Sequence, residues 1–399
     1  MISKPKSKQR YLSPSFKKGA IKQKDRENDF KINLILNGNE DDDEEELKKS
    51  PKKDQKTSKR LSLQTDGKNV NGISLKKDIM PSKKRKSAVE NDIISLTEKT
   101  KNISVSQKYV KKIAFISQAG KGEDGFTKVN QDSFFVVSNE FKFPNFNISS
   151  VLDGHGMNGH LISNFASKYF QTHIHRNKKL SALETEEDIY KMLKKNNYEL
   201  IRHFFTHCEK DISKSDIDAN FSGTTCVMLF QVGTKLICAN VGDSRCIMVT
   251  DKEIVEMSID QKPNNENEIQ RIIKAGGEVS QYEEDGIKSG PFRVWKKNEM
   301  YPGIAMSRSI GDLIATTLGV IPEPEFIEKE ITESTKFIIL ASDGVWEFLD
   351  NKMVKDIVMP FYMKNDPDGA CKALIEESTK WWENEDVVVD DITVVAIFF

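Results

Sequence analysis

Short runs of apolar residues recur through the second half of the chain, and their spacing predicts strands joined by tight turns. β-Branched and aromatic residues fill these runs, which is typical of strands. Two of the runs flank the link Gln-Val-Gly-Thr at 231–234, a strong hairpin signal, and the next run is expected to continue the same sheet. The predicted strands occupy residues 134–137, 148–152, 224–230, 235–241, 247–257, 337–341 and 392–399.

Longer stretches with apolar residues at helical spacing lie between these strands. They predict helices over 159–175 and 187–208, and a third over 266–275 that ends at Gly276 and Gly277. Two further helices are expected before the final strand. Because the strands are joined by hairpins and do not alternate with helices, the pattern predicts an α+β fold and not a doubly wound parallel sheet.

Residues 1–105 have a different character, because charged and polar residues dominate them. The first 100 residues carry 25 Lys and Arg against 16 Asp and Glu, a net charge of +9, whereas 101–399 carry 35 against 45, a net charge of −10. Such a segment buries too little apolar surface to offset the entropy of ordering, which predicts a disordered N-terminal tail. One apolar island, 32–36, is either a chance run or a docking peptide that orders on a partner.

The five cysteines form no C-x-x-C pair, and Cys226, Cys238 and Cys246 lie in apolar stretches that favour buried, inert thiols. No signal peptide is recognised, Ile2 excludes N-myristoylation, and no apolar run approaches the ~18 residues that cross a bilayer. We therefore expect a chain without a transmembrane segment, in the reducing cytoplasm or nucleus.

Aspartates stand at the ends of several predicted strands, where they can meet at one rim of a sheet. Carboxylate oxygens are the ligands that Mg²⁺ and Mn²⁺ prefer. Gly154 and Gly344 each follow one of these aspartates and permit close backbone approach. A strand-end Asp is also a common turn former, so each alone carries little weight. The aspartates are Asp132, Asp153, Asp343, Asp390 and Asp391.

Nine short motifs follow one another in the same part of the chain. They are N-Q-D-S-F-F at 130–135, V-L-D-G-H-G at 151–156, S-G-T-T at 222–225, A-N-V-G-D-S-R at 239–245, D-Q-K-P at 260–263, R-I-x-x-A-G-G at 271–277, S-R-S-I-G-D at 307–312, A-S-D-G-V-W-E at 341–347 and D-D-I-T-V-V at 390–395. This ordered series resembles the protein phosphatase 2C (PPM) family over roughly 290 residues.

The resemblance implies a fold and an activity. The fold is two antiparallel β-sheets packed as a sandwich flanked by α-helices, here expected over 106–399 behind the tail of 1–105. The activity is hydrolysis of phosphoserine and phosphothreonine in proteins, without a phosphoenzyme. Two Mg²⁺ or Mn²⁺ ions, with a weaker third, would activate a water molecule and offset the charge of the phosphate. Substrates would be phosphoproteins, and the enzyme a monomer.

Motif by motif, the resemblance also assigns roles. Asp153 would bridge the two ions, while Asp243 and Asp343 would share the weaker third. His155 would be the general acid for the leaving alkoxide, a role that suits an ordinary pKa near 6.5. The other histidines are read as structural: His160, His173, His175, His203 and His207. The metal ligands implied are Asp132, Asp153, the carbonyl of Gly154, Asp243, Asp343 and Asp390.

Four positions depart from the family pattern. Thr127 stands where many members place a phosphate-binding Arg, and the neighbouring Lys128 is the expected substitute, although a Lys cannot form the forked contact of an Arg. Gln131 replaces a Glu near the metal water. Asp391 replaces an Asn, which leaves open whether Asp390 or Asp391 binds metal. Gln261 replaces a His and is read as structural.

Residues 281–302 resemble the variable flap of the family. Two interpretations are open for this segment. It would either contact phosphosubstrate through Arg293, Trp295, Lys296 and Lys297, or it would be a solvated loop. In the tail, 81–86 resembles a nuclear localisation signal, and Ser13, Ser50, Ser62 and Ser87 resemble kinase sites. Two rival hypotheses remain at this point. One is a catalytically impaired pseudophosphatase that serves as a binding scaffold, and the other is nucleic-acid binding by the basic tail.

Overall fold

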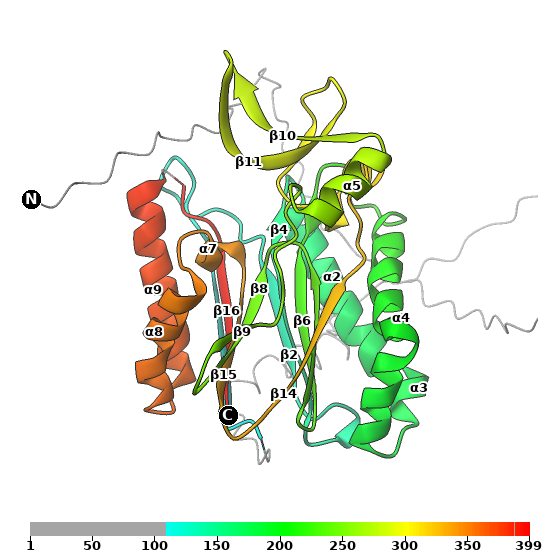
Figure 1. Ribbon diagram of the computed structural model, residues 1–399, viewed down its shortest axis with the longest axis vertical. Coiled ribbons are helices and arrows are strands. Elements are labelled where there is room, and N and C mark those ends of the chain that lie inside the picture. The colour runs from blue at the N-terminus through cyan, green and yellow to red at the C-terminus, as the bar shows by residue number, and fades with distance from the viewer. Residues whose placement is uncertain (1–108, 387) are drawn as a thin grey trace, which may run out of the picture. The chain divides into compact units, whose positions relative to one another are not determined.

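The computed structural model describes residues 109–386 and 388–399. The predicted tail, with its apolar island, its nuclear signal and its kinase sites, lies outside the described residues. In the described part, two five-stranded antiparallel sheets pack face to face, with helices on their outer sides (Figure 1). The predicted sandwich is therefore confirmed.

The first sheet contains the strand that comes last in the sequence at an inner position. Its order is β1-β16-β15-β8-β9. These strands are β1 (Lys112–Gln118), β16 (Ile392–Phe398), β15 (Thr335–Ala341), β8 (Arg245–Thr250) and β9 (Ile254–Glu256). β16 alternates along its length as a strand with two buried faces must. Val394 and Ala396 pack under the outer helices, while Val395 and Ile397 face the second sheet.

The second sheet has the order β14-β7-β6-β3-β2. Its strands are β14 (Glu325–Glu330), β7 (Lys235–Val241), β6 (Cys226–Val232), β3 (Phe146–Leu152) and β2 (Ser133–Val137). The predicted hairpin is confirmed, since β6 and β7 are joined at Gly233 and Thr234. Val151, Val227 and Leu229 from this sheet meet the inner face of the first sheet.

Residues 247–257 do not continue the sheet of that hairpin, and this prediction is wrong. After β7 the chain turns at Gly242, whose φ of +99° suits glycine, and β8 then pairs with β15 in the first sheet. Hydrophobic runs indicate that a strand is buried but not which sheet it joins, because both sheets offer an apolar inner face.

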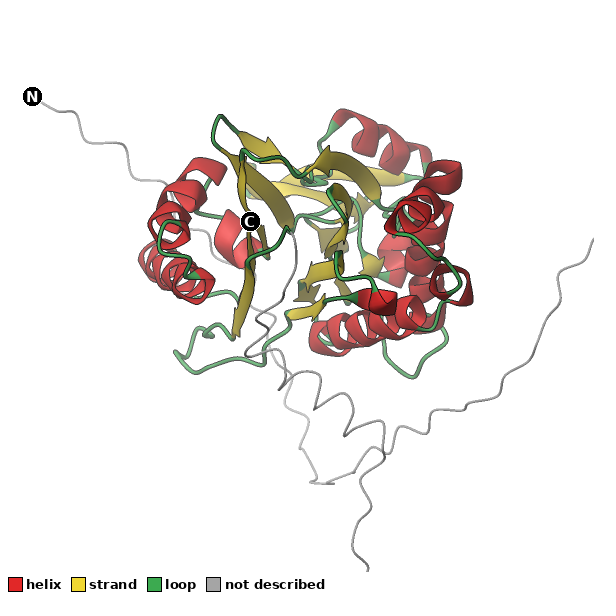
Figure 2. Cartoon of the chain, turned by 90° about the horizontal axis from the view of Figure 1, so that it is seen from below, coloured by secondary structure: helices red, strands yellow, loops and turns green. Residues whose placement is uncertain are grey.

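Helices cover both outer faces, as the view from below shows (Figure 2). Over the second sheet lie α2 (Gly159–His175), α3 (Lys178–Ser181) and α4 (Glu186–Ile212). Over the first lie α7 (Asp343–Trp346), α8 (Asn351–Tyr362) and α9 (Pro367–Glu385). The predicted helix 159–175 is confirmed. The helix predicted over 187–208 exists but is interrupted, because Asn196, Asn197 and Tyr198 have positive φ angles.

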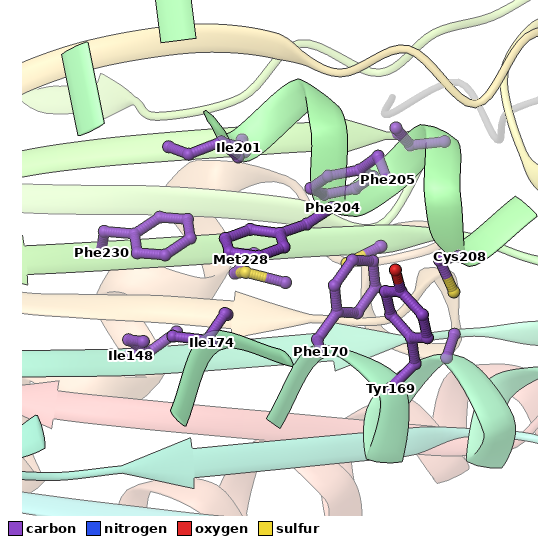
Figure 3. Packing of buried hydrophobic residues seen from close by; sticks show 14 of the residues in the cluster. Ile148, Tyr169, Phe170, Ile174, Ile201, Phe204, Phe205, Cys208, Met228 and Phe230 are labelled. Carbon is purple, nitrogen blue, oxygen red and sulfur yellow. The ribbon is translucent and has the colours of Figure 1, made fainter. Parts of the chain in front are cut away.

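Aromatic side chains fill the layer between the second sheet and its helices (Figure 3). Phe170 of α2 and Phe205 of α4 have ring centroids 4.9 Å apart, and both are fully buried with Phe230 of β6. All five cysteines are free and buried, which confirms the prediction made for Cys226, Cys238 and Cys246. Within the described residues, no helix is long and apolar enough to span a membrane.

The remaining elements lie outside the two five-stranded sheets. Most of the flap is a β-hairpin whose tip is exposed, and β10 and β11 stand at the end of the molecule where β4 lies (Figure 1). The elements are η2 (Glu140–Lys142), β4 (Gly154–His155), β5 (Gly223–Thr224), α5 (Glu266–Lys274), β10 (Gly277–Glu284), β11 (Ile287–Lys296), β12 (Pro302–Ile304), β13 (Ile310–Gly311) and α6 (Leu313–Thr316).

Candidate functional site

Aspartates from both sheets meet at one rim of the sandwich. Asp132 precedes β2 and Asp153 follows β3 in the second sheet, while Asp343 follows β15 and Asp390 precedes β16 in the first. A direct bond joins the two sheets here, because Ser342 Oγ donates to Asp132 Oδ2 at 2.8 Å. The convergence predicted from strand ends is therefore present.

The carboxyl groups at this rim raise one another's pKa values. Burial raises the pKa of Asp132 to about 7, and the charges of Asp390 and Asp391 act in the same direction against hydrogen bonds from Thr393 and Ser342. Burial also raises the pKa of Asp153 well above its ordinary range, as do the charges of nearby carboxylates. Such groups ionise together only when positive charge is brought among them.

The pKa of Asp343 is shifted in the same way. Burial is the largest cause, followed by the charges of Asp390 and Asp243, while the ammonium of Lys262 opposes the shift. Asp132, Asp243 and Asp343 each have a buried Oδ1 that finds no hydrogen-bond partner in the part of the chain described. Unpartnered buried carboxylate oxygens are costly, which makes the cluster a fitting receptor for hard cations.

The side chains do not form a closed cage. In residues 109–386 and 388–399, no three His, Cys, Asp or Glu side chains stand in an arrangement that would hold a metal ion. Mg²⁺ usually keeps several waters and takes only one or two carboxylates, so an open set of oxygens from two sheets suits it better than a cage. The donor chemistry and the unpartnered oxygens thus fit a hydrated pair of divalent ions.

The two adjacent aspartates before β16 have different surroundings. Asp391 is 3% exposed, and its two oxygens accept from the backbone N–H groups of Gly120 at 2.7 Å and Gln131 at 2.9 Å. Asp390 is more exposed and faces the cluster, where it raises the pKa of both Asp132 and Asp343. Both oxygens of Asp391 are therefore engaged by the backbone, whereas the side-chain contacts of Asp390 are made through Oδ1, which accepts from Lys128 Nζ at 2.5 Å and from Asp391 N at 2.8 Å.

Two glycines allow the strands to approach closely enough for this arrangement. A Cβ on Gly154 would lie 2.4 Å from the carbonyl oxygen of Gln131, and a Cβ on Gly344 would lie 2.1 Å from that of Asp391. Any side chain at either position would push the strand ends apart. The glycines of the D-G-H-G and S-D-G-V motifs are therefore explained by packing.

Lys128 lies on the carboxylate rim. Its Nζ is 2.5 Å from Asp390 Oδ1 and 3.5 Å from Asp391 Oδ2. Burial alone lowers the pKa of Lys128, but the charge and hydrogen bond of Asp390 outweigh it and hold the pKa above its ordinary value. Thr127 is exposed, and its backbone bridges to Lys121. Only Lys128 of this pair contacts the acidic cluster in the described residues.

Asp243 carries its own counter-ion, which the sequence analysis missed. It is 3% exposed, and its Oδ2 forms an ion pair with Lys262 Nζ. Burial lowers the pKa of Lys262, but the charge and hydrogen bond of Asp243 outweigh it and raise that pKa. Lys262 belongs to the D-Q-K-P motif, so the motif contained the signal, whereas the pairing across 19 residues did not show in the sequence.

His155 is paired with a second residue that the sequence analysis missed. Its Nε2 lies 2.6 Å from Asp312 Oδ2, and Ser309 Oγ donates to the same oxygen. Its buried Nδ1 has no partner among the described residues. Burial lowers the pKa of His155, but the charge and hydrogen bond of Asp312, with the charges of Asp243 and Asp343, outweigh it and raise that pKa.

The two glutamines that depart from the family pattern both act on the backbone. Gln131 Nε2 donates to the carbonyl of Gly156 at 2.7 Å, a contact that a carboxylate could not make. Gln261 accepts from Gly242 N at 2.7 Å and donates to Asn240 O at 3.0 Å, which fixes the turn before Asp243. The structural role expected for Gln261 is confirmed.

The other histidines lie on α2 and α4, outside the cluster. His173 Nδ1 meets the carbonyl of Tyr169, His175 pairs with Glu140, and His207 Nδ1 meets the carbonyl of His203. The structural reading of these side chains agrees with their positions.

Comparisons with known proteins identify the family to which this chain is similar. A family model described as protein phosphatase 2C matches residues 124–381. Probable protein phosphatase 2C 35 of Arabidopsis thaliana is 33% identical over 301 residues, which cover 71% of this chain and 82% of that protein. Probable protein phosphatase 2C 52 of the same plant is 30% identical over 353 residues, which cover 79% and 72%. The crystal structure of a serine-threonine phosphatase 2C from Toxoplasma gondii shares the fold, with a TM-score of 0.60 at 17% identity over 74% of this chain and 96% of that one.

Proposed function

This chain belongs to the protein phosphatase 2C family of serine/threonine phosphatases, and we propose that it hydrolyses phosphoserine and phosphothreonine in proteins by metal-dependent attack of water. The observation that carries this proposal is the cluster of buried, mutually perturbed aspartates contributed by both sheets. The comparisons lend no support to the scaffold alternative, and every carboxylate that the mechanism requires is present.

Asp132, Asp153, Asp343 and Asp390, with the carbonyl of Gly154, are the residues we assign to a pair of Mg²⁺ or Mn²⁺ ions. When bound, such a pair supplies a water that is hydroxide-like near neutral pH and offsets the charge of the phosphate dianion. The protein's part is to hold the carboxylates rigidly, through the Ser342 bond to Asp132 and the close glycine contacts.

His155 is the proposed general acid. In the protonated ring, the Nε2 proton is engaged by Asp312, which leaves the Nδ1 proton for transfer to the leaving alkoxide of the substrate. The raised pKa keeps the ring protonated over more of the neutral range than an ordinary histidine would be. Asp312 therefore both orients the His155 ring and stabilises its protonated form.

Lys128, with Thr127, is proposed to orient the phosphate. The Lys128 ammonium is held at the rim by Asp390, so its charge is placed next to the carboxylate cluster before substrate arrives. A point charge at this position attracts the phosphate without the fixed geometry of an arginine fork.

Asp243 with Asp343 is the proposed site of the weaker third ion. Because Lys262 already pairs with Asp243, an incoming cation must displace or share this ammonium. This competition is a physical reason for weak binding at that position.

Other expectations from the sequence remain predictions, namely the boundary near residue 105, kinases acting on the tail, a monomeric state and a cytoplasmic or nuclear location.

The proposed activity itself is tested with the purified full-length chain and a phosphoserine or phosphothreonine peptide. We expect phosphate release with Mn²⁺ or Mg²⁺ and none with excess EDTA. Release that EDTA leaves unchanged would contradict the metal-dependent mechanism.

A further inference from the structure

Three side chains, Met157, Phe221 and Tyr301, belong to none of the buried hydrophobic clusters of the described residues. Met157 is 88% exposed and Phe221 is 53% exposed, while Tyr301 is partly exposed. Large apolar side chains gathered on the surface are unfavourable in water and typically mark a binding site.

The three come from different segments that are fixed to one another. Met157 follows β4, Phe221 precedes β5, and Tyr301 precedes β12 at the base of the flap. The loops of Met157 and Phe221 touch, since a Cβ on Gly156 would lie 2.2 Å from the Phe221 carbonyl oxygen. The rings of Phe221 and Tyr301 meet edge to face, with centroids 6.2 Å apart. We call Met157, Phe221 and Tyr301 the apolar wall.

The apolar wall is continuous with the general acid. His155 pairs with Gly223 between β4 and β5, so Met157 and Phe221 each lie two residues beyond this pair. Asn158 N also donates to Ser222 Oγ at 3.0 Å, which fixes the Met157 loop against the Phe221 loop. Hence the wall begins where the leaving oxygen of a substrate would receive its proton.

The leaving oxygen is also the point at which the phosphate joins the polypeptide. If His155 reaches this oxygen, the backbone on either side of the phosphoresidue must pass the same rim, and its neighbouring side chains face the wall. The border of the wall is positive, since Lys296 Nζ donates to Tyr301 OH at 2.6 Å and lies 5.1 Å from the ring centroid. A basic neighbour of the phosphoresidue would be repelled there, whereas an apolar one buries surface.

We propose that the apolar wall binds an apolar side chain within two positions of the phosphoserine or phosphothreonine, so that the enzyme prefers substrates with such a neighbour. This inference rests on the proposed phosphatase function and on His155 as its general acid. Met157 and Phe221 are then specificity-determining residues, whereas the aspartates and Lys128 bind what all substrates share.

The test uses two phosphothreonine peptides of equal length and charge that differ only in having leucine or alanine at the flanking positions. With the full-length wild-type chain and Mn²⁺, we expect a kcat/KM about tenfold higher for the leucine peptide, mainly through KM, as burial of one larger aliphatic side chain predicts. Phe221→Ser and Met157→Gln should each bring the ratio of the two peptides toward one, and Phe221→Leu should retain most of it.

Met363→Gln is the matched control, because Met363 is 75% exposed just after α8 and should leave the ratio at its wild-type value. Equal kcat/KM for the two peptides in wild type would overturn the proposal, as would a ratio that both Phe221→Ser and Met157→Gln preserve. If Phe221→Ser fails to fold by circular dichroism, Met157→Gln decides. If wild type hydrolyses neither the two peptides nor phenyl phosphate, the proposed phosphatase function is contradicted, and the proposal for the apolar wall, which rests on it, is contradicted as well.

Discussion

Ser342 Oγ donates a hydrogen bond of 2.8 Å to Asp132 Oδ2 and accepts one of 3.0 Å from the backbone N–H of Thr393. Ser342 is fully buried, and it joins an aspartate of the second sheet to two neighbouring strands of the first. This hydroxyl thus helps to set the distance between the carboxylates of the two sheets, which is the dimension that a pair of cations would have to match.

Ser342→Ala should destabilise the protein by about 1–3 kcal/mol, because it removes a buried hydrogen bond to a carboxylate and leaves the buried N–H of Thr393 without a partner. It should also weaken Mn²⁺ binding, since Asp132 keeps only its hydrogen bond with Thr393. Denaturant unfolding measures the first effect and calorimetric titration the second.

Ser378→Ala is the matched control for this change. Ser378 is equally buried, but its hydroxyl has no hydrogen-bond partner in the described residues. Its removal should be neutral or stabilising. A similar loss of stability in both variants would show that the bond to Asp132 is not the cause.

Asp153→Ala should lower kcat at least ~10³-fold if Asp153 bridges two ions, because a bridging carboxylate positions both. Initial rates with saturating phosphopeptide and Mn²⁺ measure the effect. Asp356→Ala is the control, since Asp356 pairs with Lys352 on the exposed side of α8. Near-normal turnover in Asp153→Ala would contradict the assignment.

Lys128→Ala should raise KM for phosphopeptide roughly tenfold, as expected for losing one partly solvated charged contact of about 1–3 kcal/mol. Thr127→Arg should lower KM by supplying a forked donor. Mn²⁺ affinity should not fall in Lys128→Ala, because the change removes a cation from Asp390. Steady-state kinetics and a metal titration provide these values.

Lys121→Ala serves as the control for Lys128, because Lys121 lies in the same loop and pairs with Glu383 at the surface. If Lys128→Ala keeps the wild-type KM, the phosphate-orienting charge lies elsewhere, and Arg293 and Lys296 of the flap are the next candidates to test.

Glu209 should make the protein less stable as the pH rises from about 5 to 8. Burial raises its pKa from 4.5 to about 7, with the charge of Asp312 adding to the effect and the Gly311 N–H opposing it. The folded state therefore holds a proton that the unfolded chain releases near pH 4.5, and stability falls as the pH passes through this interval.

Glu209→Gln should match wild type near pH 4 and exceed it at pH 8 by about 1–2 kcal/mol, allowing for partial exposure to solvent. Urea unfolding at the two pH values measures the difference. Glu199→Gln, on the exposed side of the same helix, is the control. A gain that is equal at both pH values would rule out titration of Glu209.

Removal of residues 1–105 should leave a folded and active fragment, because the charge runs and low apolar content of this segment predict no core of its own. Limited proteolysis followed by mass spectrometry should give a stable product that begins near residue 105. Protection of 52–86 from cleavage would show that the tail is docked and that the prediction is wrong.

The sequence was sufficient to predict the strand ends that carry Asp132, Asp153 and Asp343, because periodicity and turn residues are local signals. It was not sufficient for the partners of these residues. Asp312 lies 157 residues from His155, and Ser342 lies 210 residues from Asp132. Such pairs arise from how the two sheets are stacked, which no local pattern encodes.

The placement of β8 illustrates the same limit. Its apolar run predicts a buried strand, but the choice between the sheets depends on the turn at Gly242 and on the free edge of β15. The sequence also could not distinguish the roles of the adjacent Asp390 and Asp391. The difference lies in the hydrogen bonds that Asp391 accepts from the backbone N–H groups of Gly120 and Gln131.

The inner position of β16 in the first sheet has a consequence for the biosynthesis of the protein. β16 lies between β1 and β15, and the aspartate just before it belongs to the acidic cluster. β1 pairs with β16, which is synthesised about 270 residues later. During most of translation the first sheet is therefore incomplete and the acidic cluster cannot assemble. A chain that ended before residue 392 would leave both β1 and β15 with an unpaired edge. We expect such a chain to be inactive and prone to aggregation.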